Sequence, residues 1–427
     1  MRTAFLLVGA AWFAMMAGSN LATPLYAVYE REFGFSSAVL TVVFATYALV
    51  LAPSLLVFGQ LSDRIGRRRV MAAGFVTATL GLVAFAVASG IGWLFAARAI
   101  QGLAVGMISG AAAAALVELD PAPFEDRAAL LASLAQAGGS AFGPLIAGML
   151  AEWAPARLVL PFAVFAVLGV AATAIALLIA EPADRPGGAR ERAGRAAAPR
   201  DHAHGMAAPR DRAAAPRDGS DRAPAPRALL VRPSVPRPIR VVFARVSVTG
   251  AAVWATAALF LSVVPSYAAE LLDTSNLALL GAVSATLLAV SCAAQIAARR
   301  WGAHARMQAA GLVLLAAGLL ALVLAFPARS LPLLLVAGLL TGTGHGIAFL
   351  GAQAELNLAA PPERRGEVNA AFYTLIYLGV ATTVISTGLV TLTAPLSSAI
   401  TSFAAVTGTV ALATAAWHLQ PRRVNPR

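Results

Sequence analysis

Apolar runs of roughly twenty residues recur along the whole chain, and short polar segments separate them. At helical rise, a run of about 20 residues spans the ~30 Å hydrocarbon core of a bilayer. The runs lack the period-two alternation of barrel strands, and lipid offers no partner to unpaired backbone groups, so each run predicts a membrane-spanning α-helix. Twelve spans are expected, near residues 4–27, 38–60, 70–89, 91–116, 128–151, 157–180, 242–265, 277–297, 307–326, 332–355, 368–390 and 396–417.

The character of the chain changes abruptly between the sixth and seventh runs. Residues 181–240 repeat an Ala-Pro-Arg-Asp unit, at Ala198, Ala208 and Ala215, and contain almost no large apolar side chains. Such a segment cannot bury enough surface to offset the entropy of ordering it, so we expect a disordered cytoplasmic linker. The chain then divides into an N-terminal six-helix bundle (1–180), this linker (181–240), and a C-terminal six-helix bundle with a short tail (241–427).

The two halves resemble each other at matched positions. Arg-Arg-Trp-Gly at 299–302 follows the eighth run as Asp-Arg-Ile-Gly at 63–66 follows the second, and three closely spaced glycines occur in both the fourth and tenth runs. Parallel repeats of this kind place a substrate cavity at their interface. The predicted fold is therefore an all-α membrane protein, with twelve transmembrane helices in two pseudo-symmetric six-helix bundles.

Composition and charge agree with a membrane location. Hydrophobic residues make up 59% of the chain, charged residues only 12%, and the net charge is +12. The arginines gather in alternate loops, which predicts that both termini are cytoplasmic and that the charge marks topology and not nucleic-acid binding. The first run lacks a small-residue cleavage site, so we expect a retained span. All 32 basic residues are arginine and alanine is abundant, which suggests a GC-rich bacterial genome, so we expect a multi-pass protein of a bacterial plasma membrane.

The loop after the second run, GQLSDRIGRRR, concentrates charge between two apolar runs. Gly59 permits close helix approach, Gly66 permits a tight reversal, and Asp63 requires a positive partner. A topogenic arginine cluster would explain the arginines, but neither the acid nor the glycines. The stretch resembles the loop between helices 2 and 3 of the major facilitator superfamily, and the matching residues are Gly59, Leu61, Asp63, Arg64, Gly66, Arg67 and Arg68. The resemblance implies that Asp63 faces the N-terminal end of helix 11, near residues 362–367, as a cytoplasmic gate.

The fourth run carries an intramembrane arginine. A charge inside a span costs about 2.5–3.5 kcal/mol on insertion scales, so Arg98 should face the protein interior and is a functional candidate. Together with Gln101 and Gly102 it resembles the superfamily's helix 4 motif, which is associated with proton coupling. The alternative is an arginine that snorkels to the outer interface.

The fifth run contains Gly139, Gly143, Pro144 and Gly148. This spacing resembles the helix 5 motif of drug:proton antiporter families, with Ala147 in place of one glycine. Ordinary small-residue packing in a membrane bundle is the alternative. The motif favours an antiporter.

Several polar and aromatic side chains fall at depths that suit a central cavity. We predict a substrate site from Asn20, Tyr26, Tyr47, Trp254, His345, Phe349, Tyr373 and Tyr377, although any one of these aromatics can equally be core packing. No run carries an acidic residue at mid-depth, which leaves His345 as a further proton-coupling candidate, with a neutral hydrogen-bonded histidine as its alternative. Glu118 and Glu355 lie nearer the predicted cytoplasmic helix ends and are weaker candidates.

The sequence thus predicts a secondary active transporter that exports small organic compounds by alternating access. We expect a monomer in the lipid bilayer, driven by a proton gradient, with a small-molecule substrate and no cofactor, metal or nucleic acid. The only cysteine, Cys292, excludes a disulfide framework. Nutrient uptake by a symporter or uniporter of the same fold remains open. A membrane enzyme or receptor lacks support, because no phosphate loop, carboxylate pair or His-Glu metal motif occurs.

Overall fold

A computed structural model describes residues 2–120, 127–178, 235–361 and 364–420. Within these ranges, twelve helices are long and apolar enough to cross a bilayer, which confirms the twelve predicted spans. The predicted linker lies outside the described residues, except for 235–240, where a short 3-10 helix, Arg237–Ile239, leads into the seventh span.

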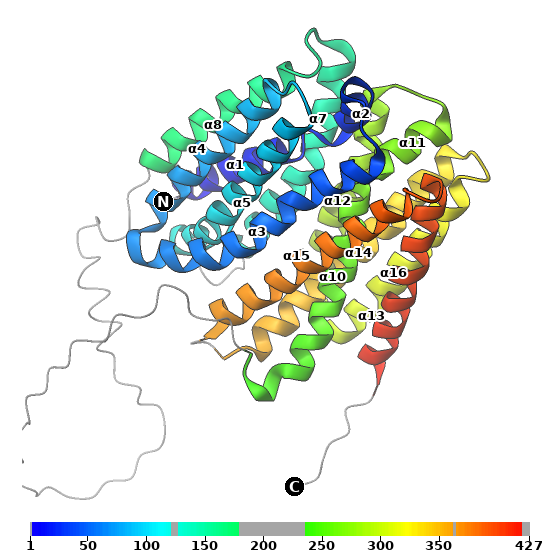
Figure 1. The fold of residues 1–427 in the computed structure, drawn as a ribbon. Coiled ribbons are helices and arrows are strands. Elements are labelled where there is room, and N and C mark those ends of the chain that lie inside the picture. Colours follow the sequence, from blue (N-terminus) through cyan, green and yellow to red (C-terminus); the bar gives the residue numbers. More distant parts are fainter. Residues whose placement is uncertain (1, 121–126, 179–234, 362–363, 421–427) are drawn as a thin grey trace, which may run out of the picture.

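The first bundle consists of the helices that Figure 1 colours from blue to green-cyan. Their bounds are α1 Arg2–Ser19, η1 Thr23–Leu25, α2 Tyr26–Phe33, α3 Ser37–Ile65, α4 Arg67–Ala86, α5 Ile91–Leu119, α6 Arg127–Ser133, the π-helical segment η2 Leu134–Gly138, α7 Gly139–Trp153 and α8 Leu160–Leu178. The second bundle runs from green to red. Its helices are α10 Arg240–Ser262, α11 Val264–Leu272, α12 Leu277–Ala298, α13 His304–Ala325, α14 Leu331–Ala359, α15 Arg365–Val390 and α16 Leu396–Leu419.

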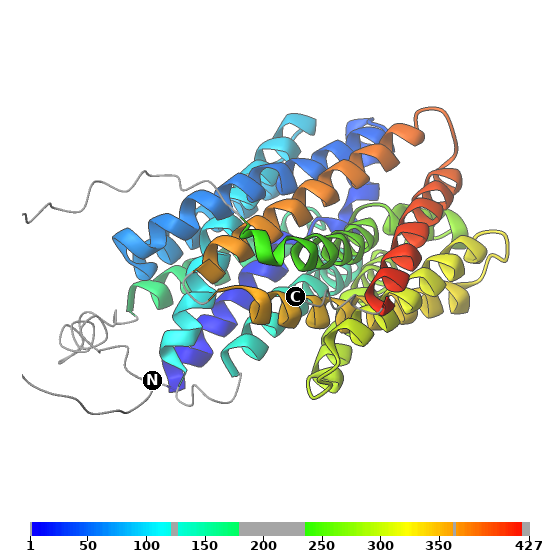
Figure 2. The same cartoon turned by 90° about the horizontal axis from the view of Figure 1, so that it is seen from below.

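The bundles lie side by side, as both views show (Figures 1 and 2). Two helix pairs join them: α3 packs along α15, and α7 packs along α12. We refer to the end of the molecule that carries α2, α11 and the last turn of α7 as the Glu152 end. The opposite end, where α3 turns into α4, is the Gly66 end.

A proline interrupts the first span of each bundle at the Glu152 end. Pro24 follows α1 and Pro265 lies at the start of α11, and a short helix continues the span in each case. A proline lacks the amide that a helix interior requires, so it redirects the chain. The first span therefore continues beyond the predicted residue 27, through α2 to Phe33, where Gly34 ends the helix with a φ of 66°.

Helix α7 approaches its neighbours very closely. A Cβ atom on Gly143 would collide with the backbone of Ala17 in α1, and one on Gly148 would collide with the backbone of Leu277 in α12. These glycines thus let α7 pack closely against α1 of its own bundle and against α12 of the second bundle, as small residues do in membrane helix packing.

Replacing Gly143 with alanine should therefore destabilise the protein. The added methyl group has no space against Ala17, and overpacking costs about 1–3 kcal/mol. Unfolding in detergent, followed by circular dichroism, measures the change. Gly408→Ala in α16 is the matched control, because a Cβ there meets nothing within 4 Å. Equal stability of both variants would contradict the close packing of α7 on α1.

Candidate functional site

The charged loop motif forms the turn between α3 and α4 at the Gly66 end. Gly66 has a φ of 99°, a conformation that favours glycine, and this explains its place at the reversal. A Cβ on Gly110 of α5 would lie 3.7 Å from the Cα of Gly59, so these two glycines bring α3 and α5 together. Arg67 forms an ion pair with Glu118, which fixes the start of α4 to the end of α5.

The predicted gate contact of Asp63 stays a prediction. Its side chain and residues 362–363 lie outside the described part of the chain. Among the described residues near the start of α15, Arg364 Nε donates to Glu367 Oε2 at 2.9 Å, and this carboxylate raises the pKa of Arg364. The other loop residues differ in burial: Leu61 and Arg68 are half-buried, and Arg64 is exposed.

Arg98 lies inside the first bundle and does not snorkel to the interface. Its side chain is 1% exposed, and it donates from Nε to the Tyr26 hydroxyl (2.5 Å) and from Nη1 to the Ser19 carbonyl (2.7 Å) and Gln101 Oε1 (2.9 Å). The aromatic rings around the guanidinium lie 5.2–5.8 Å from it and belong to Tyr26, Phe44, Tyr47 and Phe85. Cation–π attraction and hydrogen bonds thus hold this charge.

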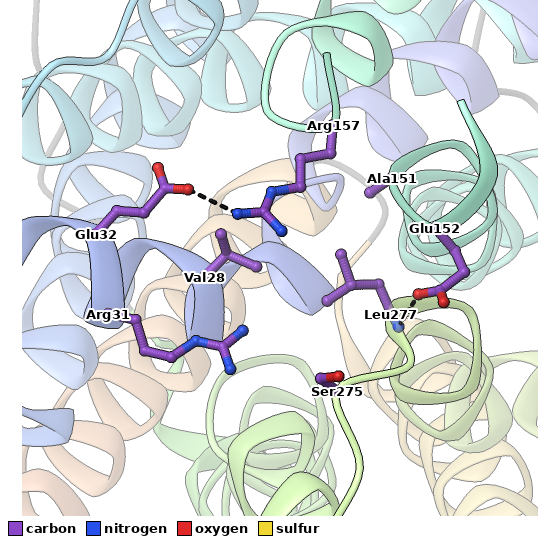
Figure 3. Close-up of a pocket in the computed structure, with 8 residues that line it drawn as sticks. All are labelled: Val28, Arg31, Glu32, Ala151, Glu152, Arg157, Ser275 and Leu277. Atoms are coloured by element: carbon purple, nitrogen blue, oxygen red, sulfur yellow. Dashed lines mark hydrogen bonds and ion pairs between the residues drawn. The ribbon is translucent and has the colours of Figure 1, made fainter. Parts of the chain in front are cut away.

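The helix 5 motif ends at a contact between the two bundles. One turn beyond Gly148, Glu152 accepts hydrogen bonds from the Leu277 amide (2.7 Å) and from Asn276 Nδ2 (3.4 Å), as Figure 3 shows for Leu277. Leu277 is the first residue of α12, so the carboxylate lies on the positive end of that helix. A second link at this end joins Ser266 of α11 to Glu30 of α2, at 3.4 Å.

A cavity of about 420 Å³ opens beside this contact at the Glu152 end (Figure 3). Charged side chains dominate its wall, including the ion pair of Arg157 with Glu32 at 3.0 Å. None of the eight residues predicted for the substrate site lines this cavity. The pocket belongs to the contact between the bundles and not to the predicted substrate site.

The structure divides the predicted substrate residues among several places. Tyr26 and Tyr47 surround Arg98 in the first bundle, while Asn20 donates to Ser140 Oγ of α7 at 3.3 Å. In the second bundle, Trp254, His345 and Phe349 form one aromatic cluster with ring centroids 5.3–5.9 Å apart. The remaining two residues bond elsewhere, Tyr373 to Gln353 and Tyr377 to Gln136.

A polar chain connects the aromatic cluster to the first bundle. His345 Nδ1 lies 2.8 Å from Ser291 Oγ, Gln295 Nε2 donates to that hydroxyl at 3.2 Å, and Ser133 donates to Gln295 Oε1 at 2.5 Å. The π-helical segment η2 follows Ser133 and carries Gln136. A π-helical turn offsets side chains relative to an α-helix and is frequent at functional sites. No feature of the sequence predicted this turn.

The sequence analysis also missed a buried ion pair in the second bundle. Arg245 of α10 pairs with Glu355 of α14, and Gln308 Nε2 of α13 donates to the same carboxylate at 2.7 Å. Next to them, Thr249 Oγ1 lies 3.0 Å from His418 Nε2 of α16, so the network involves four helices. The signal was available, because Arg245 falls inside a predicted span just as Arg98 does.

Comparison with known proteins identifies the family. The fold is that of a twelve-helix membrane transporter with two bundles, and the model of the Major Facilitator Superfamily matches residues 7–384 and 294–427. The chain belongs to this superfamily. The crystal structure of a D-xylose-proton symporter is similar over 98% of this chain and 96% of that one, with a TM-score of 0.71 and 15% identity.

Two curated relatives match part of the chain. The puromycin resistance protein pur8 of Streptomyces alboniger is 33% identical over 155 residues, which is 35% of this chain and 30% of the relative. The cephamycin export protein CmcT of Amycolatopsis lactamdurans is 30% identical over 159 residues, 37% of this chain and 33% of the relative. The matched region thus spans about a third of each relative.

Breaking the ion pair of Arg245 and Glu355 should strongly destabilise the second bundle. Glu355→Leu alone leaves a buried cation without its carboxylate, which costs about 3–5 kcal/mol. The double variant Arg245→Met with Glu355→Leu removes both charges and should recover most of that loss. Unfolding in detergent measures both. If the double variant were no more stable than Glu355→Leu, this would contradict the claim that Arg245 and Glu355 neutralise each other's charge.

Proposed function

We propose that this protein exports small organic compounds across a bacterial plasma membrane in exchange for protons. The helix 5 motif carries the proposal, because its glycines lie where α7 packs on both bundles, and its sequence resembles that of drug:proton antiporters. The names of two relatives, a puromycin resistance protein and a cephamycin export protein, support the same class of substrate.

Alternating access requires contacts that hold one end of the molecule closed at a time. We propose that the Gly66 end faces the cytoplasm with both termini, as the arginine distribution predicts, and that the Glu152 end faces outward. Glu152 and Glu30 then hold the outer end closed in this conformation, and Asp63 holds the inner end closed in the opposite one. The division at 1–180, 181–240 and 241–427 separates two rigid bundles from their linker.

Arg98 is proposed to couple proton movement to this exchange, with His345 as the titratable group deepest in the second bundle. The cation has a set of hydrogen-bond acceptors but no described carboxylate partner, so its environment responds to any charge that enters nearby. We further propose a monomer that takes its energy from the proton gradient and needs no cofactor.

Everted membrane vesicles test the direction and the energy source together. With an acidic lumen, vesicles that contain the protein should accumulate puromycin and norfloxacin, and nigericin should abolish the accumulation by collapsing the pH gradient. Accumulation in right-side-out vesicles under external acid would instead establish the uptake alternative and contradict export.

Replacing Arg98 with alanine should separate coupling from binding. We expect Arg98→Ala to lower pH-driven accumulation to the level of vesicles without the protein, while puromycin still binds to the purified variant. The control Arg69→Ala removes an exposed arginine from the same bundle. Vesicles that contain this variant should accumulate puromycin as those with the unaltered protein do. Equal loss of binding and accumulation in Arg98→Ala would show a folding role and contradict the coupling assignment.

A further inference from the structure

Two adjacent rings of the aromatic cluster carry ring nitrogens without a partner. Trp254 of α10 and His345 of α14 meet edge to face, with ring centroids 5.3 Å apart. Both Trp254 Nε1 and His345 Nε2 are buried, and neither forms a hydrogen bond. Phe349 completes the cluster one turn along α14, with its ring 5.6 Å from that of Trp254.

The polar chain from the first bundle determines whether Nε2 of His345 is a hydrogen-bond donor or an acceptor. Ser133 donates to Gln295 Oε1, so the amide nitrogen of Gln295 donates to Ser291 Oγ. His345 Nδ1, 2.8 Å from Ser291 Oγ, is the one acceptor described for the hydroxyl hydrogen of Ser291, so we assign that hydrogen to this contact. A neutral imidazole that accepts at Nδ1 carries its hydrogen on Nε2, so this nitrogen is a donor.

Trp254 and His345 therefore present two donors and no acceptor, because an indole N–H only donates. Arg245 Nε and Gln308 Oε1 are also buried without a partner, but they are one donor and one acceptor, and both residues bond the Glu355 carboxylate through other atoms. A buried donor without a partner is unfavourable, and a second one on a touching ring adds to the cost. A ligand that brings an acceptor to each nitrogen removes both deficits.

We infer that Trp254 and His345 select exported compounds that carry an oxygen acceptor, such as a carbonyl or carboxylate, on a flat ring. Oxygen atoms of the compound accept from Trp254 Nε1 and from His345 Nε2, and the flat ring packs against Phe349. The inference rests on the proposed function and adds the class of substrate to it. The chain from His345 to Ser133 also connects this donor pair to the first bundle, so a bound acceptor acts across the interface between the bundles.

Binding to the purified protein in lipid nanodiscs tests this selection without requiring transport. Norfloxacin has a ketone and a carboxylate on a flat bicycle, whereas ethidium is a flat aromatic cation without a carbonyl, and both are fluorescent. Trp254→Phe and His345→Phe keep an aromatic ring and remove the N–H. We expect each to weaken norfloxacin binding about tenfold and ethidium binding less than about twofold.

Trp12→Phe is the matched control, because Trp12 Nε1 is also buried and unpartnered but lies in α1 of the first bundle. It should bind both compounds as the unaltered protein does. Retained ethidium binding shows that the variants are folded. An equal loss for both compounds, or no loss for either, would overturn the inference and leave the proposed function standing. Failure of the unaltered protein to bind either compound would count against the proposed function itself.

Discussion

The carboxylate of Glu152 lies on the first backbone amide of α12, and this contact joins the two bundles at one end of the molecule. It depends on Gly148, one turn earlier, because a side chain there would separate α7 from Leu277 and withdraw the carboxylate. A helix-terminal charge contact of this kind is worth about 0.3–2 kcal/mol. Such a contact is strong enough to bias a conformational equilibrium and weak enough to open in each transport cycle.

The two buried arginines, Arg98 and Arg245, follow a different rule, because their described contacts stay within one bundle. Arg98 is held by carbonyl, amide and phenol oxygens and by four aromatic rings, whereas Arg245 is neutralised by Glu355. Separating such a pair is costly, because it leaves a buried charge without its partner. An arginine without a carboxylate partner among the described residues responds more strongly to a charge that enters its surroundings, which is why we propose coupling for Arg98 and a structural role for Arg245.

Much of the fold could be predicted from the sequence, because the bilayer imposes both the length of each span and its helical form. The breaks at Pro24 and Pro265 were harder to place, since apolar residues continue on both sides of them. The inward direction of Arg98 followed from the cost of a charge in lipid. Its partners did not, because Tyr26, Phe44 and Phe85 come from three other helices.

Long-range contacts explain what the sequence analysis missed. Glu152 resembles any helix-end acid until α12 is placed beside it, and the same holds for Ser133, Gln295 and Ser291, which connect to His345 only in the fold. The predicted substrate residues occupy separate clusters here for a related reason. Depth along a span places a residue in a layer of the membrane, but helix rotation decides which neighbours it meets.

The most direct test of the account measures the separation of the bundles at the Glu152 end. Spin labels at Ser36→Cys and Thr393→Cys, two exposed loop positions, report this distance in a Cys292→Ser background. Pulsed electron–electron double resonance measures the distance between the two labels. Glu152→Gln should raise the population of the longer distance about fivefold, as expected for the loss of about 1 kcal/mol, while Glu32→Gln at the same end should not. Identical distance distributions in the unaltered protein and in Glu152→Gln would contradict the claim that this carboxylate holds the two bundles together.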